Sequence, residues 1–369
     1  MRIKVKGKEL YDRISRMSVL LKSGTRDDYS KFIRFIVSGG TLTIHYFNGI
    51  VGVIDRCPGL DMTSTDDADF LVLAETFIPF LKSRKSEIEI VINEENKGME
   101  ILFNGGSLNT VCFSSASYPS LVNPSGDTVL RINSGFFVPA LKKAFSFLET
   151  DDGLHMGTTR ISMSVRDGVF DMVCTDRFKL YRMSRNMPDT PDMESLIARE
   201  LADAIYGYFS DSDVILNMNA DGRRIFFGTE DVTVMSLQVD EKFPDFRRVF
   251  DLFEPDFTVS VSRSVIKSVI DSLMFIKGRM VDFSFDGHAL AISCSEPDKR
   301  LSLKDTVPFL DGNVSGVRFR TFMNSISSVV RSVTGNSVNI EYSSKRRVFR
   351  IYDPQNEHEN TICSTLDIV

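Results

Sequence analysis

A unit of about 125 residues recurs three times along this 369-residue chain, and this internal repeat limits the possible folds more than any other feature. Six segments carry the apolar spacing of amphipathic helices. They span residues 8–20, 74–84, 134–148, 194–209, 263–277 and 320–333. Alternate segments begin at residues 8, 134 and 263 and at residues 74, 194 and 320, so each repeat contains two predicted helices.

Strand-like segments follow the same period. Between the two helices of each repeat, and again after the second helix, apolar and polar residues alternate on both sides of a polar turn, as in a β-hairpin. The six expected hairpins span residues 41–54, 87–103, 169–183, 213–228, 289–303 and 337–353. This order predicts an α+β fold of three repeated domains, each with two helices packed on a β-sheet. We expect the domains to span residues 1–124, 125–252 and 253–369.

Composition narrows the classes of function. The five cysteines are scattered and none forms a Cys-x-x-Cys pair, so buried free thiols in a reducing cytoplasm are expected, not disulfides or a zinc site. The longest apolar runs are far shorter than the roughly 20 residues of a membrane span. A formal net charge of −6 argues against a broadly basic surface that coats nucleic acid. It is compatible with basic residues confined to one surface.

No catalytic or cofactor-binding motif is evident. The chain lacks a phosphate-binding loop and a nucleophile elbow. Its four histidines lie in different repeats, and none has the spacing of metal ligands. We therefore expect no enzyme activity, cofactor or metal. Two alternatives stay open: a multidomain hydrolase with an active site between domains, which predicts a concave cluster of acidic or histidine side chains, and a DNA-independent scaffold, which predicts no common basic face.

Basic residues recur on or just after the predicted helices. Each one alone is most simply a solvated helix residue, but their recurrence predicts a shared positive surface. The helix at 194–209 fits this pattern least, because acidic residues surround its one arginine. The predicted DNA-facing residues are Lys8, Arg13, Arg16, Lys22, Arg26, Lys82, Lys142, Lys143, Arg199, Arg263, Lys267 and Arg320.

Three local segments, combined with the repeat, resemble a known family. Residues 243–249 read FPDFRRV and resemble the FPDYRRV connector between the second and third domains of the bacterial sliding clamp, the β subunit of the replicative DNA polymerase. Residues 175–180, TDRFKL, resemble that family's second-domain turn, and residues 118–121, YPSL, resemble its FPxL segment. Length and repeat period agree over essentially the whole chain, and the divergence suggests a phage or an outlying bacterial source.

The resemblance implies a head-to-tail homodimer whose six domains form a ring around double-stranded DNA, with helices inside and sheet outside. Such a ring is retained by topology, so weak, sequence-independent phosphate contacts suffice and no catalytic residue is needed. The implied partners are a clamp loader, DNA polymerase and other clients that dock through short linear peptides, with no membrane. The positions that match the family's dimer interface are Leu108, Phe275 and Ile276.

Client peptides would enter a cleft between the second and third domains. The positions that match this cleft are Thr158, Thr175, Phe178, Lys179, Leu180, Pro244, Arg248, Val249, Leu366 and Ile368. Thr158 stands where the family has an apolar residue. Residues 364–369, STLDIV, also depart from the family's MPMRL-like end, so the resemblance leaves the peptide preference open.

Overall fold

The structure is a computed structural model that describes residues 1–22, 28–93, 98–125, 127–148, 156–238, 241–276, 279–356 and 358–366. Two compact units are present. Unit 1 comprises Met1–Leu141 and Ala198–Val239, and unit 2 comprises Lys142–Ile197 and Asp240–Val369. The middle repeat thus contributes to both units, and the boundaries of the three predicted domains remain a prediction.

Unit 1 contains two antiparallel sheets. Their strand orders are β5-β1-β7-β8-β9 and β10-β6-β2-β3-β4-β18-β17-β16-β11. In the larger sheet β4 pairs with β18, which joins strands of the first and second repeats. The strands are β1 (Arg2–Lys6), β2 (Phe32–Ser38), β3 (Thr41–Phe47), β4 (Val51–Arg56), β5 (Met62–Ser64), β6 (Ala68–Leu73), β7 (Glu87–Asn93), β8 (Gly98–Phe103), β9 (Gly106–Val111), β10 (Phe113–Ser114), β11 (Thr128–Asn133), β16 (Ile215–Ala220), β17 (Arg224–Gly228) and β18 (Val232–Leu237).

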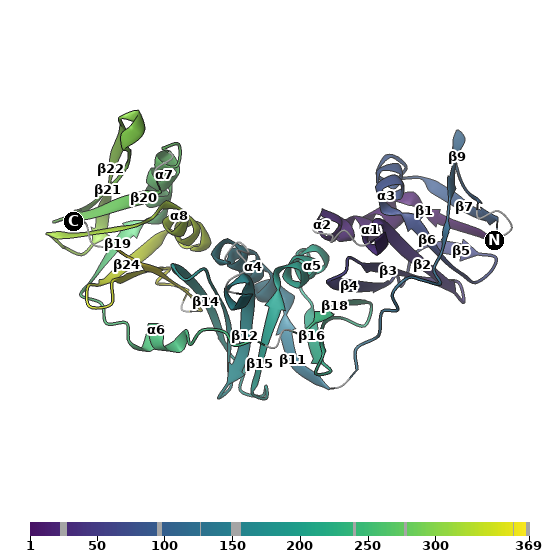
Figure 1. The fold of residues 1–369 in the computed structure, drawn as a ribbon, viewed down its shortest axis with the longest axis horizontal. Coiled ribbons are helices and arrows are strands. Elements are labelled where there is room, and N and C mark those ends of the chain that lie inside the picture. Colours follow the sequence, from purple (N-terminus) through teal and green to yellow (C-terminus); the bar gives the residue numbers. More distant parts are fainter. Residues whose placement is uncertain are drawn as a thin grey trace. The chain divides into compact units, whose positions relative to one another are not determined.

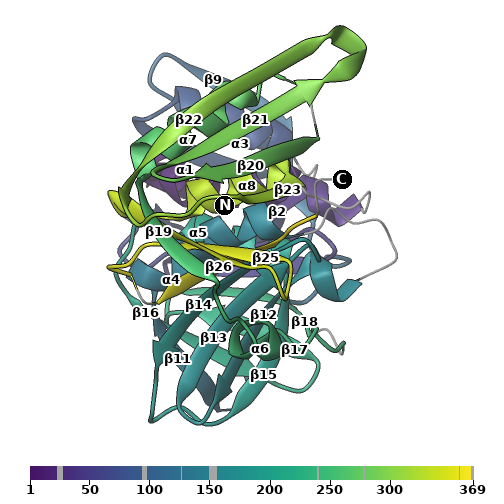
Figure 2. The ribbon, with the colours of Figure 1, turned by 90° about the vertical axis from the view of Figure 1, so that its left-hand side faces the viewer.

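Unit 2 contains one antiparallel sheet, in the order β15-β12-β13-β14-β26-β25-β24-β19-β22-β21-β20-β23. Strand β14 pairs with β26, which joins the second and third repeats. Figure 2 shows β21 and β22 as a long hairpin. The strands are β12 (Arg160–Arg166), β13 (Val169–Thr175), β14 (Lys179–Asn186), β15 (Met193–Ala198), β19 (Phe257–Ser262), β20 (Met280–Asp286), β21 (Ala289–Glu296), β22 (Leu301–Asp311), β23 (Val317–Phe322), β24 (Ser337–Ser343), β25 (Val348–Tyr352) and β26 (Glu359–Ser364).

Within each unit, pairs of helices contact one another beside the sheets (Figure 1). In unit 1 α1 contacts α3 and α2 contacts α5, and in unit 2 α7 contacts α8. Each longer helix buries an apolar face, as α7 does with Ile266, Val269, Ile270 and Leu273. The helices are α1 (Gly7–Ile14), η1 (Ser15–Met17), α2 (Ser18–Lys22), η2 (Asp28–Lys31), α3 (Ala74–Ser83), α4 (Ser134–Ala144), η3 (Phe145–Phe147), η4 (Met156–Thr159), α5 (Arg199–Phe209), α6 (Arg247–Asp251), α7 (Arg263–Leu273), η5 (Pro297–Lys299) and α8 (Met323–Ser332).

Two predicted helices begin later than expected. In the segment 194–209, residues up to 198 belong to strand β15 and helix α5 begins at Arg199. In the segment 320–333, residues up to 322 belong to strand β23 and helix α8 begins at Met323. Ala198 and Phe322, which precede α5 and α8, have extended backbones and form no side-chain cap. The sequence therefore carries no helix-start signal at either position. Arg320 lies on strand β23, which corrects its prediction as a helix residue.

The strand predictions are confirmed. All six expected hairpins are present as β3–β4, β7–β8, β13–β14, β16–β17, β21–β22 and β24–β25. The five cysteines are free and buried, as expected. In the described part of the chain, no helix is long and apolar enough to cross a membrane. No three His, Cys, Asp or Glu side chains among the described residues are arranged to hold a metal ion.

Candidate functional site

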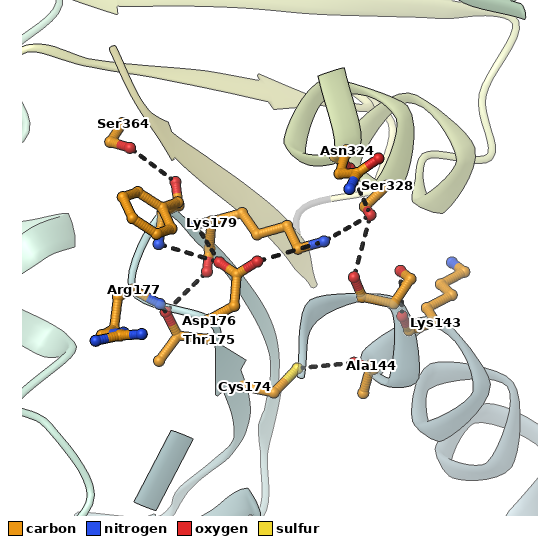
Figure 3. A network of polar contacts seen from close by, with 12 residues as sticks. Lys143, Ala144, Cys174, Thr175, Asp176, Arg177, Lys179, Asn324, Ser328 and Ser364 are labelled. Carbon is orange, nitrogen blue, oxygen red and sulfur yellow. Dashed lines mark hydrogen bonds and ion pairs between the residues drawn. The ribbon is translucent and has the colours of Figure 1, made fainter. Parts of the chain in front are cut away.

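The turn between β13 and β14 is held by side-chain hydrogen bonds. Asp176 Oδ1 accepts hydrogen bonds from the backbone N–H groups of Phe178 at 3.0 Å and Lys179 at 2.8 Å. The Thr175 hydroxyl donates to the carbonyl oxygen of Lys179 at 2.7 Å (Figure 3). Arg177 occupies the left-handed region, with φ of 77°. These contacts fix a tight turn that presents the Phe178 ring, which is 45% exposed and packs edge-on against Phe322.

The Lys179 side chain connects this turn to α8. Lys179 is only 7% exposed, and its ammonium group donates a hydrogen bond to the Ser328 hydroxyl at 2.8 Å (Figure 3). The carboxylate of Asp176 lies 3.6 Å away, and the Phe147 ring lies 5.6 Å from the ammonium nitrogen. Lys179 therefore borders the predicted cleft, while its charge is directed toward α8.

The connector at residues 243–249 is fixed to the sheet of unit 2. Phe246 is buried against Val173 and Leu180, and Phe243 packs on the same cluster. Arg247 forms an ion pair at 3.2 Å with Asp171, which is almost fully buried. The connector is thus a packed element whose position relative to β14 is set by apolar and charged contacts.

A cavity of about 280 Å³ lies between the turn, the connector and strands β25 and β26. We call it the client cavity. It brings together seven of the ten predicted cleft residues: Thr158, Thr175, Phe178, Lys179, Leu180, Pro244 and Val249. The sequence did not predict its other lining residues, which are Arg177, Phe243, Asp245, Phe246, Val348, Ile362 and Ser364. One of these, Ile362, comes from β26, whose pairing with β14 of the second repeat only the fold reveals, and Val348 lies on the neighbouring strand β25.

Of the other three predicted cleft residues, two are described and do not line this cavity. The Arg248 side chain is 81% exposed and forms an ion pair with Asp245 at 3.1 Å without lining the client cavity. Leu366 is 47% exposed and exchanges backbone hydrogen bonds with Arg320 instead of lining the cavity. Ile368 falls outside the described residues.

No reactive thiolate is expected at this site. Burial raises the pKa of the Cys174 thiol well above its ordinary value, and its Sγ lies 3.4 Å from the carbonyl oxygen of Ala144. Burial likewise raises the pKa of Cys363, which lies on β26. Both thiols stay protonated at neutral pH, and neither lines the cavity.

The predicted DNA-facing residues differ in exposure. Those exposed on described helices are Lys8, Arg16, Lys82, Lys142 and Arg199. Those partly buried are Arg13, Lys143, Arg263, Lys267 and Arg320. The side chain of Lys22 and all of Arg26 lie outside the described residues. A basic face shared by all six helices remains a prediction.

Carboxylates neutralise several of the partly buried basic residues. Arg13 forms an ion pair at 3.0 Å with the fully buried Asp55. Lys267 lies 2.9 Å from Asp271, whose pKa is lowered by hydrogen bonds from Lys267 and Arg331. Further ion pairs join Lys143 to Glu359 and Arg320 to Asp282. Among the exposed residues, Arg199 also forms an ion pair, with Asp203 at 3.8 Å. We therefore expect the other exposed residues to make most of any phosphate contacts.

The three predicted interface residues have different surroundings. Leu108 is half-buried on β9, the last strand of the five-stranded sheet of unit 1. Phe275 follows α7 and is 64% exposed. Ile276 is only 1% exposed because it packs into the core of its own unit. This finding corrects its assignment to a surface that contacts a second copy.

This arrangement of repeated hairpins and paired helices is the fold of the bacterial DNA polymerase sliding clamps. Solved structures include the β subunit of Streptococcus pyogenes DNA polymerase, with a TM-score of 0.89 and 13% identity, and the DNA polymerase III β subunit of Thermotoga maritima, with 0.87 and 16%. A Helicobacter pylori β clamp bound to a DNA ligase peptide matches with a TM-score of 0.84 and 14% identity. Each match covers 100% of both chains. No protein-family model and no curated protein sequence matches the chain.

Proposed function

We propose that the chain is the subunit of a sliding clamp that encircles double-stranded DNA and tethers DNA polymerase and other clients to it. Full-length agreement with solved sliding clamps, at TM-scores of 0.84 to 0.89, is the observation that carries this proposal. Two three-domain chains joined head to tail would close into a six-domain ring, opened and placed by a clamp loader in the cytoplasm. The activity requires no catalytic residue, cofactor or metal ion.

The charge distribution supports a partner that is encircled and not tightly bound. The chain carries a net charge of −6, yet exposed lysine and arginine residues recur on its helices. Contacts between such residues and phosphates are independent of sequence and weaken as salt rises, which permits sliding. An acidic remainder would discourage DNA from adhering to other surfaces.

The client cavity supports docking of short peptides. Leu180, Pro244 and Val249 supply apolar surface on strand β14 and on the connector, which pack against each other. An apolar side chain of a peptide that enters such a cavity would lose contact with water and dominate the affinity. The Helicobacter pylori clamp that shares the fold is bound to a DNA ligase peptide, in keeping with this class of partner.

Head-to-tail assembly is supported by apolar residues at both predicted ends of the seam. Phe275 exposes most of its ring, and Val111 and Leu108 lie on β9, at one end of its sheet. Covering the outer edge of this strand with a second copy would remove an exposed sheet edge. Ile276 would support the seam only indirectly, by holding Phe275 in place.

Peptide titration tests the proposed docking site. Leu180 belongs to a buried cluster, so its truncation would also destabilise the fold. Phe178 and Val249 are 45% and 38% exposed, and Phe178→Ala combined with Val249→Ala should weaken binding of a labelled polymerase tail peptide about tenfold. Leu310→Ala removes an equally apolar side chain, 62% exposed and outside the cavity, and is the matched control. Equal affinities in fluorescence anisotropy for all variants would place the peptide elsewhere.

A further inference from the structure

Unit 1 contains a second cavity, of about 250 Å³, bordered by β4, β17, β18 and residues 119–122. We call it the unit 1 cavity. Its lining includes Phe47, Ile50, Leu121 and Met235, together with Leu237, which is 68% exposed. No part of the proposed DNA contacts, client docking or dimer seam uses this cavity.

The unit 1 cavity lies between strands of the first and second repeats, as the client cavity lies between strands of the second and third. Gly52 of β4 lies opposite Met235 of β18, as Leu180 of β14 lies opposite Ile362 of β26. All four residues line their respective cavities. Two further pairs of opposite residues correspond between the cavities. Phe47 lies opposite Gly52, as Thr175 lies opposite Leu180. Arg224 lies opposite Leu237, as Val348 lies opposite Ser364.

The turns that border the two cavities also match. Asn48 Oδ1 accepts hydrogen bonds from the backbone N–H groups two and three residues later, at 3.0 and 2.7 Å. Asp176 Oδ1 accepts the corresponding bonds at 3.0 and 2.8 Å. The next residues, Gly49 and Arg177, both have positive φ, of 91° and 77°. The same side-chain-stabilised turn therefore shapes one wall of each cavity.

The connectors that close the two cavities are also counterparts. Leu121 packs on the cluster of Ile54, Phe226 and Met235, as Phe246, 125 residues later, packs on Val173 and Leu180. Gly52 makes the close approach of Leu121 possible, because a Cβ at this position would lie 2.8 Å from Leu121 Cδ2. The connector of unit 1 thus also packs against the sheet beside its cavity, although Leu121 is only partly buried.

The two cavities differ in charge. Arg224 stands where the client cavity has Val348, and it is the one charged side chain among the described residues that line the unit 1 cavity. Among the described residues no carboxylate forms an ion pair with its guanidinium group, although Asp221 is close: backbone hydrogen bonds from Arg223 and Arg224, and the charge of Arg224, lower the pKa of Asp221. An arginine at the rim of an apolar pocket favours a ligand in which a carboxylate lies beside an apolar side chain.

We propose that the unit 1 cavity is a second docking site for short peptides, which bind through an apolar side chain next to a carboxylate. The apolar side chain lies against Ile50 and Met235, and the carboxylate accepts hydrogen bonds from Arg224. The inference rests on the proposed role of the client cavity, since the structural match between the two cavities is what indicates a peptide ligand. It gives each chain two docking sites whose linings carry different charged residues.

Isoleucine methyl NMR on the full chain distinguishes the two sites, because Ile50 lines the unit 1 cavity and Ile362 lines the client cavity. Methyl signals are assigned with Ile50→Val and Ile362→Val. The probe is the synthetic peptide acetyl-Ala-Leu-Phe-Asp, titrated to about 1 mM, and an otherwise identical peptide with a C-terminal amide and Asn in place of Asp is the neutral control. Arg224→Glu is compared with Arg223→Glu, which makes the same charge change at an exposed neighbour that does not line the cavity.

We expect a saturable shift of the Ile50 signal that persists when Phe178→Ala and Val249→Ala are combined. Arg224→Glu or the neutral peptide should weaken it about tenfold, and Arg223→Glu much less. An Ile362 shift without an Ile50 shift overturns the second site and leaves the proposed function intact. An Ile50 shift without an Ile362 shift supports the second site and counts against the client cavity. Movement of neither signal, or equal effects of the two arginine variants, overturns the inference.

Discussion

Replacing Lys179 by methionine tests whether the polar network beside the client cavity stabilises the chain. The ammonium group is buried, donates to the Ser328 hydroxyl at 2.8 Å and lies 3.6 Å from the Asp176 carboxylate. Methionine retains most of the apolar stem and removes the charge. The change therefore isolates the polar contacts of one buried side chain.

The expected magnitude follows from two opposing terms. A hydrogen bond that involves a charged group contributes about 1.5–3 kcal/mol, whereas relief of the buried ammonium's desolvation offsets part of that loss. We expect Lys179→Met to lower the free energy of unfolding by about 1–2 kcal/mol. Ser328→Ala leaves the ammonium buried with a poorer set of partners and should cost about 1–3 kcal/mol. The double variant should be more stable than the sum of the two losses predicts, by about 1 kcal/mol.

Urea denaturation followed by circular dichroism, at one fixed protein concentration, measures these differences. Lys345→Met is the matched control, because the ion pair of Lys345 with Glu254 is largely exposed and should contribute less than about 1 kcal/mol. A Lys179→Met variant as stable as the original chain, or losses that simply add in the double variant, would refute the reasoning.

Three further predictions concern single side chains. Burial and the charge of Arg34 lower the pKa of His45 to about 4. The contribution of this group to the free energy of unfolding is therefore complete above pH 6.5 and falls by about 3 kcal/mol as the pH is lowered from 6.5 to 4. His45→Gln should flatten that dependence in urea titrations, and an unchanged slope would contradict it. Phe275→Asp should convert dimers to monomers in sedimentation, whereas Ile276→Asp should lower the melting temperature of the chain itself; a dimer that survives Phe275→Asp excludes that residue from the seam. Arg177→Gly should raise stability in thermal unfolding by up to about 1 kcal/mol, because glycine adopts a φ of 77° without strain; a loss would mean that the arginine side chain contributes more than the strain costs.

The sequence predicted the strand pairs well because each hairpin is local. Alternating apolar residues on both sides of a polar turn specify β3–β4 or β13–β14 without reference to the rest of the chain. Helix starts were less predictable. Helices α5 and α8 each continue directly from a strand, and neither Ala198 nor Phe322 supplies the capping side chain that marks a start.

The site residues divide in a similar way. Thr175, Leu180 and Pro244 were identified from short segments that resemble those of the sliding clamps. The opposite wall of the client cavity was not predictable, because Ile362 reaches it through a pairing with Leu180, 182 residues away in the sequence (362 minus 180). The burial of Ile276 was likewise not predictable, since an apolar residue after a helix is equally compatible with an interface and with a core.

Retention on DNA tests encirclement most directly. A bacterial clamp loader is used to place the chain on a nicked circular plasmid, and half of the sample is linearised. Both halves are passed through gel filtration in about 0.5 M salt, where phosphate contacts are strongly weakened. Topological retention predicts that the chain stays with the circular DNA and is lost from the ends of the linear DNA. Equal retention on both forms, or loss from both, would contradict encirclement.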